Sequence, residues 1–209
     1  IDALLTNRMP LASHIARMPF FGLGCVGGAA GLSRCRDWLL GHPDKAAVLL
    51  SVELCSLTLQ RKDLSIPNLI STGLFGDGAA AVVAVGDQHP LAGANQGPRV
   101  RASRSVFFPD TEAVMGWTIS ESGFEVVLSA EVPDLVQSKI RENTESFLKD
   151  EGLKLSDLTH YVCHPGGPKV LKAIENALDL DDDALSISWE SLKEMGNLSS
   201  ASVLINLSK

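Results

Sequence analysis

The sequence predicts an α/β layered fold, and two features of the chain carry that prediction. First, apolar runs bounded by turn residues alternate along the chain with amphipathic, helix-like segments, as in α/β layered folds. Second, the chain has 209 residues, of which 45% are hydrophobic and 21% are charged. This length and composition are typical of a globular protein with a substantial core.

The first half of the chain alternates helix and strand signals. Residues 1–17 predict a short helix followed by a loop. The apolar run 18–21 leads through a turn of small residues into a helix over 32–40, and Gly41-His42-Pro43 closes this helix. Residues 46–53 form a continuous apolar run, which predicts a strand buried on both faces. A second buried strand is expected over 79–85.

A break in composition divides the chain into two halves. Residues 86–99 are rich in glycine and proline and predict a loop, so we expect an N-terminal half over 1–95 and a C-terminal half over 96–209. Beyond the break the pattern predicts, in order, a strand over 123–129, a helix over 132–149, a strand over 158–163, a helix over 169–178 and the start of a last helix within 197–204, capped by Asn197 or Ser199.

Composition also excludes several classes of function. The formal net charge is −7 and no basic stripe is present, which argues against a nucleic-acid partner. The four cysteines are widely spaced without a Cys-x-x-Cys pair, so we expect a reduced, cytoplasmic protein with no disulfide or zinc framework. No apolar run approaches the length of a membrane span. The chain starts without Met and already in helical rhythm, so we expect it to begin inside a larger protein.

Cys25 is the first candidate for a catalytic group. It lies among glycines and alanines at a predicted strand-to-helix turn, where small neighbours allow a substrate to approach the sulfur. Free N–H groups at a helix start favour the nucleophilic thiolate. A free cysteine is also a common small filler of tightly packed helices. Both interpretations are open at this point.

Other polar residues near the predicted strands have simpler interpretations. Asp77, between two glycines, is expected to hold turn backbone more often than to act as an acid. His42 precedes a proline and reads as a loop residue. Cys55 and Thr58 follow the strand over 46–53 at its carboxyl end, where α/β sheets place ligands. Cys55 is therefore expected either to line a cavity or to fill core.

His164 and Asn197 occupy positions of the same kind as Cys25. His164 is followed by Pro-Gly-Gly, so a substrate chain could run past its ring, and Asn197 lies between Gly and small residues at a helix start. A thiolate, an imidazole and an amide together suit acyl-thioester chemistry with a stabilised enolate or oxyanion. Each residue also has a structural interpretation: Cys25 could fill the core, His164 could have its hydrogen bonds satisfied within the fold, and Asn197 could cap a helix. Their sequence separations do not show that they meet.

Four motifs in order resemble one family. They are Gly-Cys-Val-Gly-Gly-Ala (24–29), Leu-Phe-Gly-Asp-Gly-Ala-Ala-Ala (74–81), His-Pro-Gly-Gly-Pro (164–168) and Gly-Asn-Leu-Ser-Ser-Ala-Ser (196–202). Together they resemble the type III polyketide synthases, the chalcone and stilbene synthase family. The resemblance implies the thiolase fold, a layered α-β-α-β-α pair of α/β halves, and a homodimer. It also implies that this chain is an incomplete portion of a bacterial member that lacks both ends.

The resemblance assigns catalytic roles to three residues. Cys25 matches the nucleophile that takes the starter acyl group from its CoA thioester. His164 and Asn197 match the pair that promotes decarboxylation of malonyl-CoA and holds the enolate oxygen for Claisen condensation. His164 as an imidazolium would keep Cys25 ionised. CoA thioesters are the expected substrates, and neither a metal nor another cofactor is expected.

The resemblance also implies a set of substrate-contacting positions. Phe75 matches a gatekeeper between the CoA tunnel and the growth cavity, and Gly166 and Gly167 match the loop beside the pantetheine arm. The remaining expected members are Cys55, Thr58, Trp117, Val126 and Ser199.

Three of these positions depart from the plant pattern. Val126 replaces a second gatekeeper phenylalanine, Trp117 stands at a small cavity-floor position, and Cys55 replaces a threonine, as in bacterial members. The resemblance also implies that two segments of the family are missing from this chain. One is the N-terminal region, which supplies CoA-phosphate contacts, and the other is the closing Gly-Phe-Gly-Pro-Gly loop.

The sequence therefore predicts an acyltransferase of the type III polyketide synthase family. It would condense malonyl-CoA iteratively onto an acyl-CoA starter through an acyl-cysteine. Two alternatives stand beside this prediction. One is an enzyme like ketoacyl-ACP synthase III, which performs one condensation. The other is a catalytically silent fragment with the thiolase fold.

Overall fold

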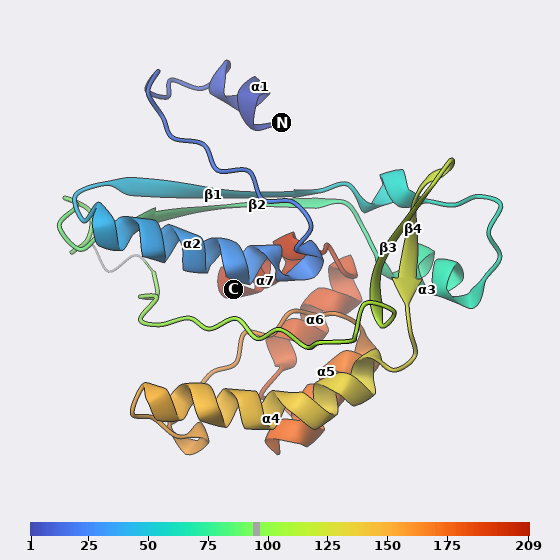
Figure 1. The fold of residues 1–209 in the computed structure, drawn as a ribbon. Coiled ribbons are helices and arrows are strands. Elements are labelled where there is room, and N and C mark those ends of the chain that lie inside the picture. The colour runs from blue at the N-terminus through green and yellow to red at the C-terminus, as the bar shows by residue number, and fades with distance from the viewer. Residues whose placement is uncertain (94–96) are drawn as a thin grey trace.

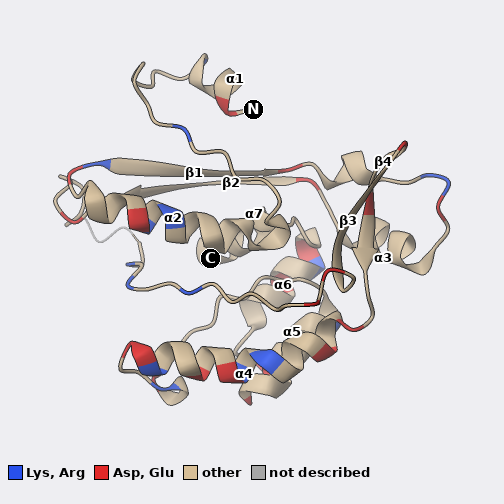
Figure 2. Cartoon of the chain, viewed as in Figure 1, with Lys and Arg blue, Asp and Glu red and all other residues tan. Residues whose placement is uncertain are grey.

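The computed structural model describes residues 1–93 and 97–209 (Figure 1). The expected boundary between the halves, at residues 95 and 96, lies outside the described residues and stays a prediction. Over the described ranges, no helix combines the length and the apolar character needed to cross a bilayer. Acidic and basic residues are interspersed along the chain, and Figure 2 shows both kinds along α4 (Val132–Asp150).

One antiparallel sheet consists of β1 (Ala46–Glu53) and β2 (Gly78–Val85), with Ala46 opposite Val85 and Glu53 opposite Gly78. Helices α2 (Gly27–Gly41) and α7 (Ser200–Leu207) contact this sheet, and Figure 1 shows α2 along one face. Leu49 and Ser51 are buried, whereas Val48 and Leu50, which alternate with them along the strand, are exposed. The expectation of a strand buried on both faces is therefore wrong, because helices from the described residues cover only one face.

The other elements follow in chain order. They are α1 (Asp2–Thr6), 3-10 turns at Gly24–Val26, Cys55–Thr58 and Leu155–Asp157, α3 (Ile66–Leu74), the hairpin of β3 (Met115–Ser120) and β4 (Gly123–Leu128), α4 (Val132–Asp150), α5 (Pro168–Leu178) and α6 (Ser186–Met195). The predicted helices over 132–149 and 169–178 and the strand over 123–129 are confirmed within one residue. The helix predicted over 32–40 also forms, but α2 begins five residues earlier, at Gly27. Of the helix expected within 1–17, only α1 forms.

The strand expected over 158–163 does not form. This segment has no regular secondary structure, because within the described residues no strand lies beside it to accept a ladder of hydrogen bonds. Tyr161 and Cys163 instead pack against the main apolar cluster. The segment nevertheless leads directly into His164, so its position is fixed by side-chain contacts rather than by a sheet.

The main apolar cluster lies between α4, α5 and α6. Leu171, Ile174 and Leu178 follow the three- and four-residue spacing of one helix face, and they pack with Leu185. Glu175 is also buried on α5, where its carboxylate accepts hydrogen bonds from Trp189 Nε1 (2.6 Å) and Lys172 Nζ (3.0 Å). The cluster gives α5 a firm position, and the Gly166–Gly167 loop immediately precedes this helix.

The starts of α2 and α7 approach each other closely. A Cβ placed on Gly28 would lie 2.2 Å from the backbone oxygen of Ser200 and 2.8 Å from a methyl group of Val203. Only a residue without a side chain fits there. This contact places the turn that carries Cys25 against the residues that begin α7.

We expect Gly28→Ala to destabilise the protein by about 1–3 kcal/mol or more, because the new methyl group must separate α2 from α7. Gly41→Ala, at the other end of the same helix, is the matched control, since nothing lies within 4 Å of its Cβ position. Denaturant unfolding of both variants measures the difference. Equal stabilities would show that the two helices do not need this close approach.

Candidate active site

Cys25 lies in the 3-10 turn that immediately precedes α2. The residues before it, 18–21, do not form a strand, so the expected strand-to-helix turn is a loop-to-helix turn. Gly22 and Gly24 on its N-terminal side have φ angles of 89° and 50°, which favour glycine. The Cys25 side chain is partly buried and faces the start of α7.

The backbone of Asn197 is held by the end of α3. Its N–H donates to the carbonyl of Leu74 (2.8 Å), and its carbonyl accepts from the N–H of Gly76 (3.0 Å). These two hydrogen bonds form an isolated parallel bridge between Asn197 and Phe75. The residue is 1% exposed. This bridge links two of the four motifs, Leu-Phe-Gly-Asp-Gly and Gly-Asn-Leu-Ser-Ser, in one place.

The Asn197 side chain spans two parts of the site. Its Nδ2 donates to the carbonyl of Gly166 (3.2 Å), and its Oδ1 accepts from the N–H of Ser199 (2.8 Å). The same amide and the Ser199 hydroxyl both face the Cys25 thiol as hydrogen-bonding groups. The structure thus brings Cys25, Asn197, Ser199 and the loop after His164 together.

The predicted helix cap is only partly as expected. Ser199 is the N-cap residue of α7, but its side chain makes no capping hydrogen bond. Its φ of 51° is unusual for a residue with a side chain. Because Asn197 Oδ1 holds its N–H, Ser199 keeps this conformation, and its hydroxyl is directed to Cys25 instead.

Burial and a nearby carboxylate disfavour the thiolate form of Cys25. Burial raises the pKa of Cys25 above its ordinary value, and the negative charge of Glu53 raises it further. Hydrogen bonds from Ser199 and Asn197 oppose this rise without cancelling it. The expectation that the helix start and an imidazolium keep Cys25 ionised stays a prediction, and burial and the charge of Glu53 act against it.

His164 is buried as a neutral ring. Burial lowers its pKa to about 4. Neither ring nitrogen has a hydrogen-bond partner within residues 1–93 and 97–209. The ring edge (Cδ2) lies 3.5 Å from the position that a Cβ on Gly166 would occupy. A neutral imidazole with two unpartnered nitrogens can accept a proton at one and donate a hydrogen bond from the other.

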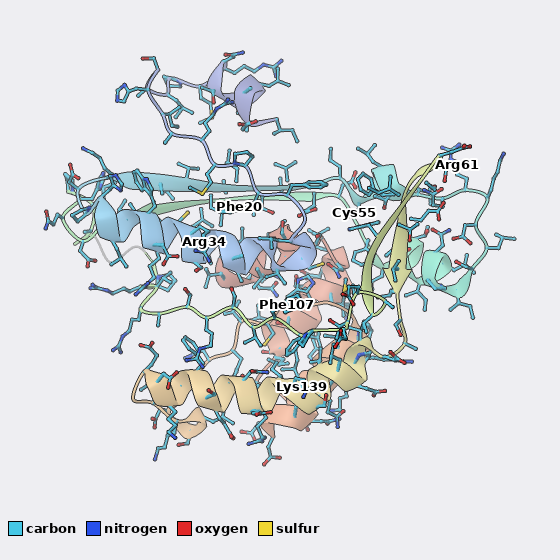
Figure 3. All side chains as sticks on the ribbon, in the orientation of Figure 1. Phe20, Arg34, Cys55, Arg61, Phe107 and Lys139 are labelled. Atoms are coloured by element: carbon cyan, nitrogen blue, oxygen red, sulfur yellow. The ribbon has the colours of Figure 1, made fainter. Side chains whose placement is uncertain are left out.

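Four of the expected substrate-contacting positions lie on two elements, the turn after β1 and the hairpin of β3 and β4. Cys55 and Thr58 share the turn after β1, where Thr58 Oγ1 donates to the carbonyl of Cys55 (2.8 Å). This turn contacts β4, and Figure 3 shows Cys55 beyond the end of the sheet. Burial, and then the charge of Glu53, raise the pKa of Cys55 to about 11. Trp117 and Val126 are cross-strand partners in the hairpin, with Trp117 50% exposed.

Glu53 is a residue of the site that sequence reasoning missed. Its carboxylate accepts hydrogen bonds from the N–H (3.3 Å) and the hydroxyl of Ser200, and that hydroxyl lies 2.8 Å from the hydroxyl of Ser51. Glu53 thereby ties the end of β1 to the start of α7. The sequence did contain a signal for this role, because Glu53 is an acidic residue at the end of the apolar run 46–53.

Asp77 and His42 have the structural roles expected of them. Asp77 accepts hydrogen bonds from the N–H and hydroxyl of Ser56, both at 2.7 Å, and these bonds lower its pKa. The His42 ring stacks on Trp38 at 4.2 Å. Among the described residues, no group of three or more His, Cys, Asp or Glu side chains is arranged to hold a metal ion.

Comparison with known proteins now decides the family. Residues 1–88 match the N-terminal domain and residues 99–209 match the C-terminal domain of the chalcone and stilbene synthases. The chain belongs to the chalcone and stilbene synthase family. Its fold is the thiolase-like α/β fold of these enzymes, which are type III polyketide synthases and transferases.

Relatives and solved structures support the assignment. The chain is 56% identical over 204 residues to 1,3,6,8-tetrahydroxynaphthalene synthase from Streptomyces peucetius subsp. caesius, covering 98% of this chain and 54% of that protein. The crystal structure of the synthase of the same name from Streptomyces coelicolor A3(2) superposes with a TM-score of 0.91 at 32% identity, covering 99% and 57% of the two chains. PKS-I from the brown alga Ectocarpus siliculosus superposes with a TM-score of 0.90 at 27% identity, covering 99% and 54%. The chain thus spans about half the length of these relatives.

Two substitutions are expected to move the Cys25 pKa in opposite directions. Glu53→Gln removes a negative charge and lowers the pKa, whereas Ser199→Ala removes a hydrogen bond and raises it. The rate of iodoacetamide labelling at Cys25, followed by peptide mass spectrometry across pH, should shift to lower and higher pH respectively. Labelling of Cys35 in the same samples is the internal control. Shifts in the same direction would contradict the assigned electrostatics.

The low pKa of His164 makes stability depend on pH. The pKa of His164 in the folded protein, about 4, lies below its ordinary value of 6.5. The unfolded chain therefore binds more protons than the folded protein between pH 4 and 6.5. The free energy of unfolding should therefore fall as the pH drops below 6.5, with a total loss of about 3 kcal/mol near pH 4.

His164→Gln is expected to remove this component, so that the difference between wild type and variant changes across pH 4 to 6.5. His14→Gln, at an exposed histidine, is the control and should follow the wild type. Denaturant unfolding at several pH values measures both. A His164→Gln curve parallel to the wild type would show that His164 is not buried in the neutral form.

Proposed function

We propose that the protein carrying this chain is a type III polyketide synthase that condenses malonyl-CoA iteratively onto an acyl-CoA starter. The supporting observation is the Asn197 side chain, which faces the Cys25 thiol and also binds the loop after His164. A sulfur nucleophile, a neutral imidazole and an amide donor in one site are the groups that decarboxylative Claisen chemistry needs.

In the first step Cys25 takes the starter. His164 accepts the thiol proton at a ring nitrogen, and the sulfur attacks the carbonyl carbon of the acyl-CoA. The bond from that carbon to the CoA sulfur breaks, and CoA leaves with the proton. Burial raises the pKa of Cys25 and lowers that of His164, so the proposal has the thiol proton pass to the imidazole as the substrate arrives.

In the second step malonyl-CoA supplies the new carbon–carbon bond. Its carboxylate leaves as carbon dioxide, and the electron pair forms an enolate whose oxygen accepts hydrogen bonds from Asn197 Nδ2 and the His164 ring. The enolate carbon attacks the acyl carbon and the bond to the Cys25 sulfur breaks, which gives the extended chain as its CoA thioester. The sulfur leaves as a thiolate and takes up a proton from water. All of these groups are side chains and CoA thioesters, so the proposal includes no further cofactor.

The substrate side of the proposal rests on neighbouring residues. Phe75 is assigned to the entrance because its backbone bridges to Asn197, and Gly166 and Gly167 to the pantetheine arm because they join His164 to α5. Cys55, Thr58, Trp117, Val126 and Ser199 are assigned to the growth cavity. Identity of 56% to a tetrahydroxynaphthalene synthase supports a polyhydroxylated naphthalene as the product class. The active unit is proposed to be a homodimer.

Three substitutions test the roles. Cys25→Ala should abolish condensation and leave decarboxylation of malonyl-CoA measurable. His164→Ala should impair decarboxylation, and Asn197→Ala should lower it by about 10²-fold, because one donor to the oxyanion is lost. Cys35→Ala, a substitution of another partly buried cysteine in the middle of α2, is the matched control for Cys25.

The assay incubates the whole protein with malonyl-CoA and short, aromatic and long acyl-CoAs, and detects products and carbon dioxide by mass spectrometry. Unchanged decarboxylation in His164→Ala would reject its role. A product of a single condensation would favour the ketoacyl-ACP synthase III alternative, and no product or carbon dioxide from the wild type would favour a silent protein.

A further inference from the structure

The peptide groups on both sides of His164 are fixed by hydrogen bonds. The carbonyl of Cys163, the residue before it, accepts from the Ser188 hydroxyl (2.8 Å) on α6 and from Asn206 Nδ2 (3.1 Å) on α7. The carbonyl of His164 itself accepts from the N–H of Gly166 (2.9 Å). Since each peptide group is planar, fixing these two carbonyls fixes the Cα from which the imidazole extends.

These side chains replace the support that a sheet would give. Residues 158–167 have no regular structure, and no described strand pairs with them. A carbonyl oxygen has two lone pairs, and Ser188 and Asn206 supply one donor for each. The Cys163 carbonyl therefore cannot rotate without breaking two buried hydrogen bonds at once.

Stability alone does not account for an amide at position 206. Ser188 and Asn206 are 0% and 1% exposed, and Asn206 Oδ1 has no partner among residues 1–93 and 97–209. A buried carbonyl without a hydrogen bond is destabilising, and leucine would fill a similar volume without that cost. Asn206 differs from leucine in that it donates a hydrogen bond to the Cys163 carbonyl.

We propose that Ser188 and Asn206 are positioning residues for His164, which they hold through the Cys163 carbonyl in the orientation that decarboxylation requires. This inference rests on the proposed function for its catalytic consequence. Its structural part, the protection of the ring, is independent of that function. Neither residue touches the reacting atoms. Both act by holding the backbone from which the ring extends, because a displacement of a catalytic group by about 1 Å is enough to cost about 10²-fold in rate.

The test uses variants that remove one donor or both. Ser188→Ala and Asn206→Leu each remove one, the double variant removes both, and Ser188→Thr keeps a hydroxyl as the conservative rescue. Ser191→Ala is the matched control. Ser191 is a serine on the same helix, 1% exposed, whose hydroxyl has no partner in the described part of the chain.

Two measurements are made on the whole protein at a temperature where each variant is folded. The first is kcat and KM for malonyl-CoA decarboxylation, beside the iodoacetamide labelling rate of Cys25. The second is carbethoxylation of His164 by diethylpyrocarbonate, quantified by peptide mass spectrometry, which reports access to the ring without requiring any activity.

We expect each single loss to lower kcat by about tenfold or more with little change in KM or in Cys25 labelling, since the ring is displaced but the thiol is not. His164 should become more reactive to diethylpyrocarbonate. Ser188→Thr should restore both values, and Ser191→Ala should match the wild type. If the double variant does not fold, the single variants decide.

Folded Ser188→Ala and Asn206→Leu proteins with wild-type kcat and wild-type protection of His164 would overturn the proposal. A wild type that does not decarboxylate malonyl-CoA would reject the proposed function. In that case the His164 modification rates alone decide whether Ser188 and Asn206 hold the ring, and unchanged rates overturn that part too.

Discussion

The close approach of α2 to the start of α7 is the constraint on which the site depends. Gly28 has no side chain, so the Ser200 carbonyl can lie where a Cβ would otherwise stand. Glu53 holds the same turn of α7 to the end of β1 through the N–H and hydroxyl of Ser200. Cys25 lies beside residues 197–200 because the Gly28 and Glu53 contacts both hold Ser200 in place. Packing of backbone against backbone therefore sets the position of the nucleophile.

Burial then decides the charge state of the site. Desolvation raises the pKa of the Cys25 thiol and lowers that of the His164 imidazole, and both shifts favour uncharged groups. A resting ion pair would need attraction strong enough to overcome the removal of both charges from water. In this structure Glu53 adds a negative charge near the thiol, which opposes ionisation further.

Much of the secondary structure could be predicted from local pattern. The helices over 32–40, 132–149 and 169–178 repeat their apolar residues at helical spacing, and local spacing is sufficient to define a helix. The segment 158–163 has a strand-like composition but remains irregular, because a strand exists only when another strand lies beside it. The strand over 46–53 formed as expected. Its burial on one face was set by which helices cover it, and composition does not encode that.

By itself, the sequence determined which chemical groups the site contains and which family the chain belongs to. Cys25, His164 and Asn197 stand in short motifs whose small neighbours are local features, and a motif can be read without knowing the fold. Only the tertiary structure decided that Glu53 binds Ser200 at the start of α7, and that Ser188 and Asn206 bind the carbonyl before His164. It also decided that burial raises the pKa of the thiol and lowers that of the imidazole. The physical reason is that hydrogen bonds between distant segments and loss of water depend on what surrounds a residue, which its sequence neighbours do not specify.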